Sequence, residues 1–362
     1  MGSEVFRLWW ELFFPGLFSG KGKIFLTAFL AILILALAAT FLGASEVLEN
    51  IKHVSPGTLA LASFVYCASW PLRGMRFQQI LNRLGNHYGI GFLTGSIFIS
   101  QSANVILPAR IGDLSRMYIL KKSKDLAFTT SFSSLTVERV FDIIAITFIA
   151  ILASSGVASR LELTPWMESL IKFSGVAVLL FFAALFILSY RESRNKKKGK
   201  EKVHKNISGE PLSKIKEFAS TFIRQMSVVA VRPGAFLAVV ASSLLIWGMD
   251  IFTCFLVLKA FPAAGVDMTS TFSISLVFLA VALGNIAKTF PITPGAIGTY
   301  EVALTAVFVL GGIKPELAFT VAVIDHIIKN SITLLGGGLA LSELGFRWRE
   351  VLSTNTDTLK GM

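Results

Sequence analysis

Long apolar runs alternate with short polar or basic segments along almost the whole chain, without the two-residue alternation typical of strands. Several runs reach the roughly 20 residues that a helix needs to cross about 30 Å of hydrocarbon. The pattern therefore predicts an all-α fold, a polytopic transmembrane helical bundle. Six full spans are expected, at residues 24–43, 56–72, 126–155, 170–190, 233–261 and 316–341.

Two further apolar segments are interrupted by proline and glycine. Basic residues lie on both sides of residues 90–107, which are too few to cross a bilayer twice, so we expect a helical hairpin that re-enters from the cytoplasmic side. Residues 270–310 are interrupted by Pro-Ile-Thr-Pro-Gly-Ala-Ile-Gly, which predicts a second re-entrant hairpin from the outer side. Simple helix kinks are the alternative. The expected hairpin tips are Pro108, Gly112, Pro291, Pro294, Gly295 and Gly298.

The two interrupted regions form part of an internal repeat. Residues 108–113 align with 294–299 at an offset of 186, and Glu138–Asp142 align with Asp325–Lys329 at an offset of 187. Because the hairpins are expected to enter from opposite sides, the repeats would be inverted. Inverted repeats with broken helices recur in secondary transporters, whose sites lie at the repeat interface near the middle of the membrane.

Composition supports a membrane location. The chain is 54% hydrophobic and 15% charged, with a mean hydropathy of +0.69, whereas an average soluble domain is about 25% charged. The net charge is +12, and the segment 191–232 carries 12 Lys and Arg against four acidic residues. This pattern favours a cytoplasmic loop that contacts anionic lipid headgroups over a nucleic-acid site. Within this loop, the apolar spacing of residues 211–231 predicts an amphipathic surface helix.

Charge also sets the expected topology. Arg73, Arg76 and Arg83 follow the second span and are expected to mark its cytoplasmic end, while the linker 44–56 is expected on the outer side. Both termini are expected in the cytoplasm, and the protein in the cytoplasmic membrane. The expected organisation is an interfacial helix at 1–23, a first membrane half at 24–190, the basic loop at 191–232, a second half at 233–345 and a cytoplasmic tail at 346–362.

Charged residues inside the membrane segments are the candidate functional groups. A charge at the centre of a membrane helix costs about 2.5–3.5 kcal/mol by insertion scales. Glu138 and Asp142 share a helix face, as do Asp325 and Lys329, because each pair is four residues apart. These groups are either ion pairs that lock hairpins to helices or a partly wet pathway for a charged headgroup. The candidate pathway residues are Arg110, Asp113, Arg116, Glu138, Arg139, Asp142, Lys288, Glu301, Asp325 and Lys329.

Catalytic and metal-binding motifs are not recognisable. The two cysteines and four histidines fit no metal spacing, and neither a phosphate-binding glycine loop nor a clear nucleophile–base arrangement is present. We therefore expect no metal, no cofactor, no ATP hydrolysis and no enzymatic activity.

Three motifs carry a family resemblance: Asn104–Arg116, Glu138–Asp142 and Pro291–Glu301. Over residues 20–345 the chain resembles the flippase-like transmembrane family, the membrane region of lysylphosphatidylglycerol synthases of the MprF type. It departs from the usual pattern at Asp113, where many members have Glu, and at Ala296, where a second Gly is usual. The resemblance implies movement of a polar lipid between leaflets without naming the lipid. The aminoacyl-transferase domain of the MprF type is not expected in this chain.

We expect the protein to move an anionic phospholipid or a polyprenyl-phosphate-linked lipid across the cytoplasmic membrane. Arg110 and Arg116 would hold the phosphate with their planar guanidinium groups, Glu138 and Asp142 would orient them, and the charges of the second half would form a mirror site. The alternatives are a small-solute or ion secondary transporter and a membrane lipid-modifying enzyme. Expected partners are membrane lipids and a lipid- or glycan-synthesis enzyme, with no nucleic acid; the oligomeric state is left open.

Overall fold

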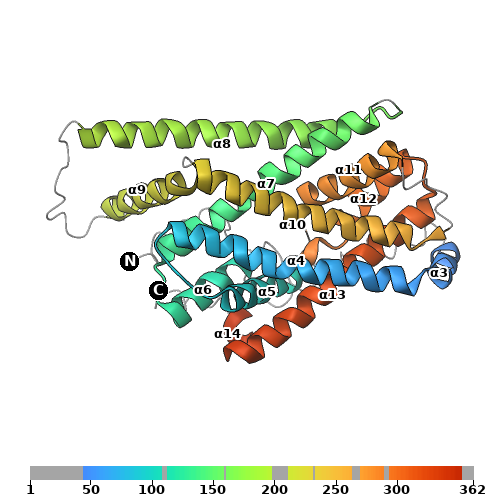
Figure 1. Cartoon of the computed structure of the whole chain (residues 1–362), viewed down its shortest axis with the longest axis horizontal. Coiled ribbons are helices and arrows are strands. Elements are labelled where there is room, and N and C mark those ends of the chain that lie inside the picture. Colours follow the sequence, from blue (N-terminus) through green and yellow to red (C-terminus); the bar gives the residue numbers. More distant parts are fainter. Residues whose placement is uncertain are drawn as a thin grey trace.

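The computed structural model describes residues 44–107, 112–158, 160–197, 211–230, 233–262, 270–288 and 293–352. Outside these ranges lie the expected interfacial helix and first span, most of the cytoplasmic tail, and the residues Pro108, Arg110 and Pro291. The described part of the chain is helical and contains no strand (Figure 1). Its elements are α3 (Ala44–Lys52), α4 (Pro56–Arg83), α5 (Ile90–Ile106), α6 (Gly112–Lys124), α7 (Phe128–Val157), α8 (Pro165–Lys197), α9 (Pro211–Ala230), α10 (Pro233–Lys259), α11 (Thr271–Ala287), the 3-10 turn η3 (Pro294–Ala296), α12 (Thr299–Leu310), α13 (Pro315–Leu344) and α14 (Trp348–Leu352).

Three of these helices, α7, α10 and α13, are long and apolar enough to cross a membrane. The outer face of α13 is apolar, since Leu335 is 69% exposed and Leu339 is 74% exposed. Large exposed apolar surfaces are rare on soluble monomers and are expected where lipid is the solvent. The described chain therefore has the character of an all-α membrane protein, as the sequence predicted.

Helix α4 is longer than the sequence suggested. It begins at Pro56 as expected, but it continues through Pro71 to Arg83 instead of ending near residue 72. Phe77 and Ile80 are fully buried on this extension, so their packing holds the helix together beyond its proline. Arg76 is only 1% exposed, so its side chain lies inside the bundle and not in a polar segment after the helix; the side of the membrane that this end of α4 faces stays a prediction.

Two pairs of consecutive short helices, α5–α6 and α11–α12, are each separated by a break that falls where the sequence predicted it. Helix α5 ends at Ile106 before α6 begins at Gly112, and α11 ends at Ala287 before α12 begins at Thr299. Before α12 the backbone has positive φ at Gly295 (60°), Ala296 (58°) and Gly298 (90°), which no continuous helix allows. The second interruption is therefore a full break and not a kink, and at the first the backbone of Leu107 is already extended (φ −103°, ψ 141°). The paired short helices pack on each other, α5 on α6 and α11 on α12; their re-entry into a membrane stays a prediction.

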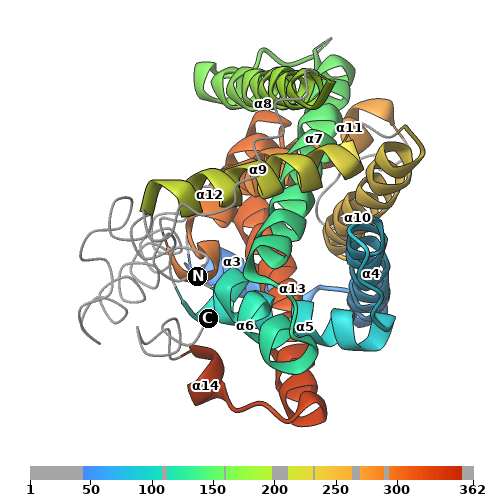
Figure 2. The ribbon, with the colours of Figure 1, turned by 90° about the vertical axis from the view of Figure 1, so that its left-hand side faces the viewer.

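Two segments that the sequence predicted as loops are partly helical. Helix α8 runs on to Lys197, and the linker 44–56 contains the short helix α3. The amphipathic helix predicted at 211–231 is confirmed as α9. Its Phe218 and Phe222 pack against Phe132 of α7, with ring centroids 5.8 and 5.7 Å apart, so this helix is docked on the bundle. Figure 2 shows α8 at the top of the bundle and α9 crossing in front of it, and both helices contact α7.

Helices from the two halves of the chain pack in exchanged pairs. Helix α4 lies beside α10, α5 packs on α13, and α11 packs on α7 (Figures 1 and 2). The first short helix of each half, α5 or α11, therefore packs against the long helix of the other half. As a result, the centre of the molecule is the interface between the halves.

Glycine allows α13 to approach α5 closely. A Cβ atom at Gly337 would overlap the side chain of Ser102, whose hydroxyl donates to the Thr333 carbonyl oxygen at 2.7 Å. At the neighbouring Gly338 no atom lies within 4 Å of the corresponding position. The two adjacent glycines therefore differ in their surroundings and not in their backbone.

Gly337→Ala is expected to destabilise the protein by roughly 1–3 kcal/mol, because the added methyl group overpacks the contact between α5 and α13. Gly338→Ala is expected to stabilise it by about 0.5–1 kcal/mol, because it only removes the entropic cost of glycine in a helix. Unfolding in detergent, followed by circular dichroism, measures both. Effects of the same sign and size would contradict the close packing.

Candidate functional site

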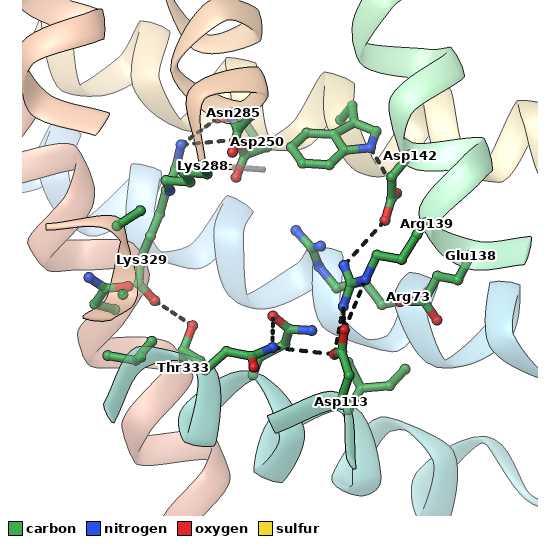
Figure 3. Close-up of a pocket in the computed structure, with 18 of the residues that line it drawn as sticks. Arg73, Asp113, Glu138, Arg139, Asp142, Asp250, Asn285, Lys288, Lys329 and Thr333 are labelled. Carbon is green, nitrogen blue, oxygen red and sulfur yellow. Dashed lines mark hydrogen bonds and ion pairs between the residues drawn. The ribbon is translucent and has the colours of Figure 1, made fainter. Parts of the chain in front are cut away.

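A cavity of about 390 Å³ lies between α4, α5, α7, α10, α11 and α13 (Figure 3). The segment before α12 closes part of it with Thr293, Gly295 and Ala296. Trp70 and Trp247 present aromatic surface to the cavity. The charged residues that line it are Arg73, Asp113, Glu138, Arg139, Asp142, Asp250, Lys288 and Lys329.

The first charge cluster comprises Arg76, Arg116, Arg139, Asp113, Glu138 and Asp142. Arg116 Nη1 contacts Glu138 Oε2 at 2.8 Å, and Arg139 Nη2 contacts Asp113 Oδ1 at 2.8 Å. Arg76 pairs with Asp142 and lies 3.6 Å from Glu138 Oε1. The structure thus brings Asp113 and Arg116 to the charged face of α7, as the sequence predicted, and three cations balance three carboxylates.

Arg76 is the member of this cluster that sequence reasoning missed. It reaches both carboxylates of α7 from α4, and its Nη1 donates to Ser243 Oγ of α10 at 3.0 Å. A signal was present in the sequence, because Phe77, Ile80 and Leu81 continue an apolar helical face past residue 72. That face indicates a helix whose arginine points inward.

The second charge cluster comprises Lys329, Asp250 and Asp325. Lys329 Nζ lies 3.1 Å from Asp250 Oδ2 and 2.9 Å from Asp325 Oδ2, and the Tyr300 hydroxyl donates to Asp325 at 2.7 Å. The ion pair between Asp325 and Lys329 confirms the shared helix face predicted from their spacing. Asp250 joins them from α10, and Figure 3 shows Lys329 and Asp250 across the cavity from Asp113 and Asp142.

Glu301 is placed away from the cavity. Its Oε2 accepts a hydrogen bond from the Gly298 backbone N–H at 2.7 Å, which caps α12, and its Oε1 lies 2.6 Å from His326 Nδ1. Its position is that of a helix cap, since a carboxylate at this point satisfies a free N–H and complements the helix dipole. His326 was not singled out by the sequence. Among the described residues no group of His, Cys, Asp and Glu is arranged to hold a metal ion.

Helix α10 contacts both charge clusters along one face. Ser243 accepts from Arg76, Trp247 Nε1 donates to Asp142 Oδ1 at 2.9 Å, and Asp250 pairs with Lys329. Spacings of four and three residues place these side chains in one stripe. Trp247 therefore orients a buried carboxylate.

Arg73 and Lys288 differ from the other cations of the cavity. Neither makes an ion pair within 4 Å with any described residue, although both line the cavity. The guanidinium carbon of Arg73 lies 5.4 Å from the ring centroid of Trp70, and Lys288 Nζ lies 3.7 Å from that of Tyr300. Contacts between cations and aromatic faces contribute about 0.5–2 kcal/mol, so they hold these side chains without neutralising them.

A family model for the lysylphosphatidylglycerol synthase TM region matches residues 24–337. The chain belongs to this family. It is 34% identical to the glycosyltransferase AglD of Haloferax volcanii over 93% of this chain and 57% of that protein. It is 24% identical to a UPF0104 membrane protein of Pyrococcus horikoshii over 88% of this chain and 97% of that protein. A UPF0104 membrane protein of Methanothermobacter thermautotrophicus is 21% identical over 85% and 91% of the two chains.

Membership in the lysylphosphatidylglycerol synthase TM family confirms the resemblance and the multi-pass membrane character. The expectation that the protein is not an enzyme is contradicted by its likeness to a protein named as a glycosyltransferase. The lack of a contiguous motif does not exclude an enzyme, because catalytic carboxylates meet in space and not in sequence. The chain spans 57% of AglD, so it matches only part of that protein.

Arg76→Met is expected to destabilise the protein by about 3–5 kcal/mol, because it leaves Asp142 and Glu138 with a buried, uncompensated charge. Arg83→Met, on an exposed part of the same helix, is expected to change stability by no more than about 0.5 kcal/mol. Unfolding by titration with sodium dodecyl sulfate measures both. A small effect at Arg76 would contradict the assignment of a buried ion pair.

Proposed function

We propose that the chain binds the headgroup of an anionic membrane lipid in the central cavity and carries it between the two leaflets. The observation that carries this proposal is a cavity lined by eight charged residues inside a bundle with apolar outer helices. Lipid tails would stay in the surrounding bilayer while the headgroup moves along the polar interface between the halves.

Energetics support a protein-lined route. A charged group in hydrocarbon is costly, and it crosses only where paired charges or water compensate it. The two charge clusters provide such compensation on opposite walls of the cavity. A volume of about 390 Å³ is at the small end of ordinary ligand pockets, which span roughly 300–1,000 Å³. It suits a headgroup and leaves no room for acyl chains.

We further propose that the two halves are inverted repeats and that both pairs of short helices are re-entrant. The exchanged packing supports this, since the contact of α5 with α13 has its counterpart in that of α11 with α7. Exchanging the halves also maps α4 onto α10, which lie together. Irregular backbone at membrane depth is tolerated where protein or a wet cavity covers it, and Gly295 and Ala296 line the cavity.

The buried arginines have a supporting role in this proposal. Arg116 is fully buried and paired with Glu138, so it is not placed to grip a headgroup as the sequence interpretation had it. Arg76 is engaged in the same way. Both ion pairs fix the helices that form the cavity wall. In this proposal some buried charges are therefore ion pairs between helices, and others line the pathway of the headgroup.

A second candidate function is the transfer of a sugar to or from a membrane lipid. The observation that favours it is the likeness to the glycosyltransferase AglD. Asp113, Asp142 and Asp250 line the cavity and could serve an acid–base role there. Formation of a glycosylated lipid by the purified chain, from a nucleotide sugar and a polyprenyl phosphate, would favour this function.

Asn330→Trp is expected to abolish lipid transfer, because its side chain lines the cavity and a large ring would fill it. In vesicles that contain the purified protein, fluorescent phosphatidylglycerol of the inner leaflet should become accessible to dithionite with wild type. With Asn330→Trp the rate should fall to that of protein-free vesicles.

The matched control is Leu335→Trp on the same helix, whose side chain is 69% exposed on the outer face. It should transfer lipid like wild type. Wild-type vesicles that transfer no lipid, or full transfer by Asn330→Trp, would contradict the proposed route.

Cysteine labelling tests the proposed topology, in which both termini and the basic loop 191–232 face the cytoplasm. With exposed Cys67 replaced by serine and Cys254 left buried, Ala109→Cys is expected to react with an impermeant maleimide only from the cytoplasmic side. Ile292→Cys is expected to react only from the outer side. Arg83→Cys and Lys259→Cys serve as references for the two sides, and labelling of both tips from one side would contradict inverted hairpins.

A further inference from the structure

We propose that Arg73 and Lys288 together form the phosphate-binding site of the cavity. This inference rests on the proposed function, because it names the chemical group of the lipid that the cavity recognises. It replaces the sequence-based assignment of the phosphate to Arg110 and Arg116: Arg116 is fully buried against Glu138, and Arg110 lies outside the described residues.

Arg73 is placed to meet a ligand. It projects from α4, and Figure 3 shows its side chain extending between the wall of Asp142 and the wall of Asp250. Its Nε is buried and has no hydrogen-bond partner among the described residues. The Nε atoms of Arg76 and Arg116 also lack partners, but those guanidinium groups bind carboxylates through their Nη atoms. Arg73 makes no ion pair with a described residue, so its guanidinium group is the one with donors left for a ligand or an ion. The rings of Trp70 and Tyr66 support the guanidinium from one side.

Lys288 approaches from the other half of the chain. It is the C-cap residue directly after α11, and its ammonium lies 3.7 Å from the ring centroid of Tyr300. The nearby Lys329 is held by Asp250 and Asp325, whereas Lys288 has no carboxylate within 4 Å among the described residues. A contact with an aromatic face leaves the donors of an ammonium on the far side free for an anion.

The charge balance around the cavity also favours a bound anion. Counting the described residues that line the cavity or pair with lining residues gives six cations and five carboxylates. One positive charge is therefore left over in a site surrounded by apolar helices. A phosphodiester carries one negative charge, so it would neutralise the site without displacing an existing ion pair.

The geometry favours phosphate over carboxylate. A guanidinium binds two oxygens of a phosphate with its planar fork, and an ammonium binds as a point charge from any direction. Arg73 and Lys288 come from α4 and α11, so a shared ligand must offer oxygens in more than one direction. A tetrahedral phosphate does so, whereas the two oxygens of a carboxylate lie in one plane.

Calorimetric titration of the full chain in detergent tests the site with dioctanoyl phosphatidylglycerol as the probe. Arg73→Gln and Lys288→Gln are each expected to weaken binding by about tenfold or more, which corresponds to roughly 1.4 kcal/mol. Arg73→Lys should retain part of the affinity, because it keeps the charge but loses the fork. The exposed Arg83→Gln and Lys259→Gln remove the same charges elsewhere and should bind like wild type.

Two further probes separate the possible sources of the phosphate. Uncharged dioctanoylglycerol should not bind, and inorganic phosphate should bind more weakly than the lipid. Equal affinity for inorganic phosphate would keep the site but overturn a lipid as its ligand. Unchanged phosphatidylglycerol binding in folded Arg73→Gln and Lys288→Gln would overturn the site itself.

Lipid transfer by the same variants separates this inference from the proposed function. If Arg73→Gln and Lys288→Gln bind and transfer phosphatidylglycerol like wild type, the phosphate site is wrong and the transfer route stands. If wild type transfers no lipid, the route is wrong whatever the variants bind. Should Arg73→Gln fail to fold, Lys288→Gln and Arg73→Lys carry the same comparison.

Discussion

The structure around the cavity depends on buried ion pairs between helices that lie far apart in the sequence. Arg76 of α4 engages Asp142 and Glu138 of α7, and it also contacts Ser243 of α10. In a bundle surrounded by lipid, each of these groups is tolerable only while its partner is present. The pairs therefore fix the relative positions of the helices more strictly than apolar packing alone, because apolar side chains gain little by leaving lipid for protein.

Helix α10 links the buried polar contacts of both walls of the cavity. The helix hydrogen-bonds the first charge cluster through Trp247 and belongs to the second through Asp250. A rearrangement that opens the cavity must therefore keep the ion pairs intact or replace each lost partner at the same time. Rigid movement of whole helix groups satisfies this condition, and the glycine-rich break before α12 is a place where the backbone already departs from helical geometry.

Local signals predicted much of the fold. Periodicity and length predicted α7, α9 and α13, and the proline and glycine clusters predicted the breaks before α6 and α12. Spacing alone predicted the pairing of Asp325 with Lys329. The extension of α4 was missed because arginines after an apolar run are typical of a cytoplasmic end. Tertiary packing of Phe77 and Ile80 overrides that local signal.

The candidate site was harder to predict, for a physical reason. The cost of burying charge identifies which residues matter, but a single sequence does not say which of them meet. The hydrogen-bonded residues Trp247 and Asp142 are 105 positions apart in the sequence, and Arg76 and Ser243 are 167 positions apart. Only once those partners are known does it become clear which cations are already neutralised. Arg116 and Lys329 are then ion-paired residues that hold helices together, whereas Arg73 and Lys288 have no carboxylate partner within 4 Å among the described residues and are candidates to bind a ligand. In a membrane protein of this kind, a buried charge therefore supports the fold when its partner is internal, and it becomes a candidate for function when the protein supplies no partner.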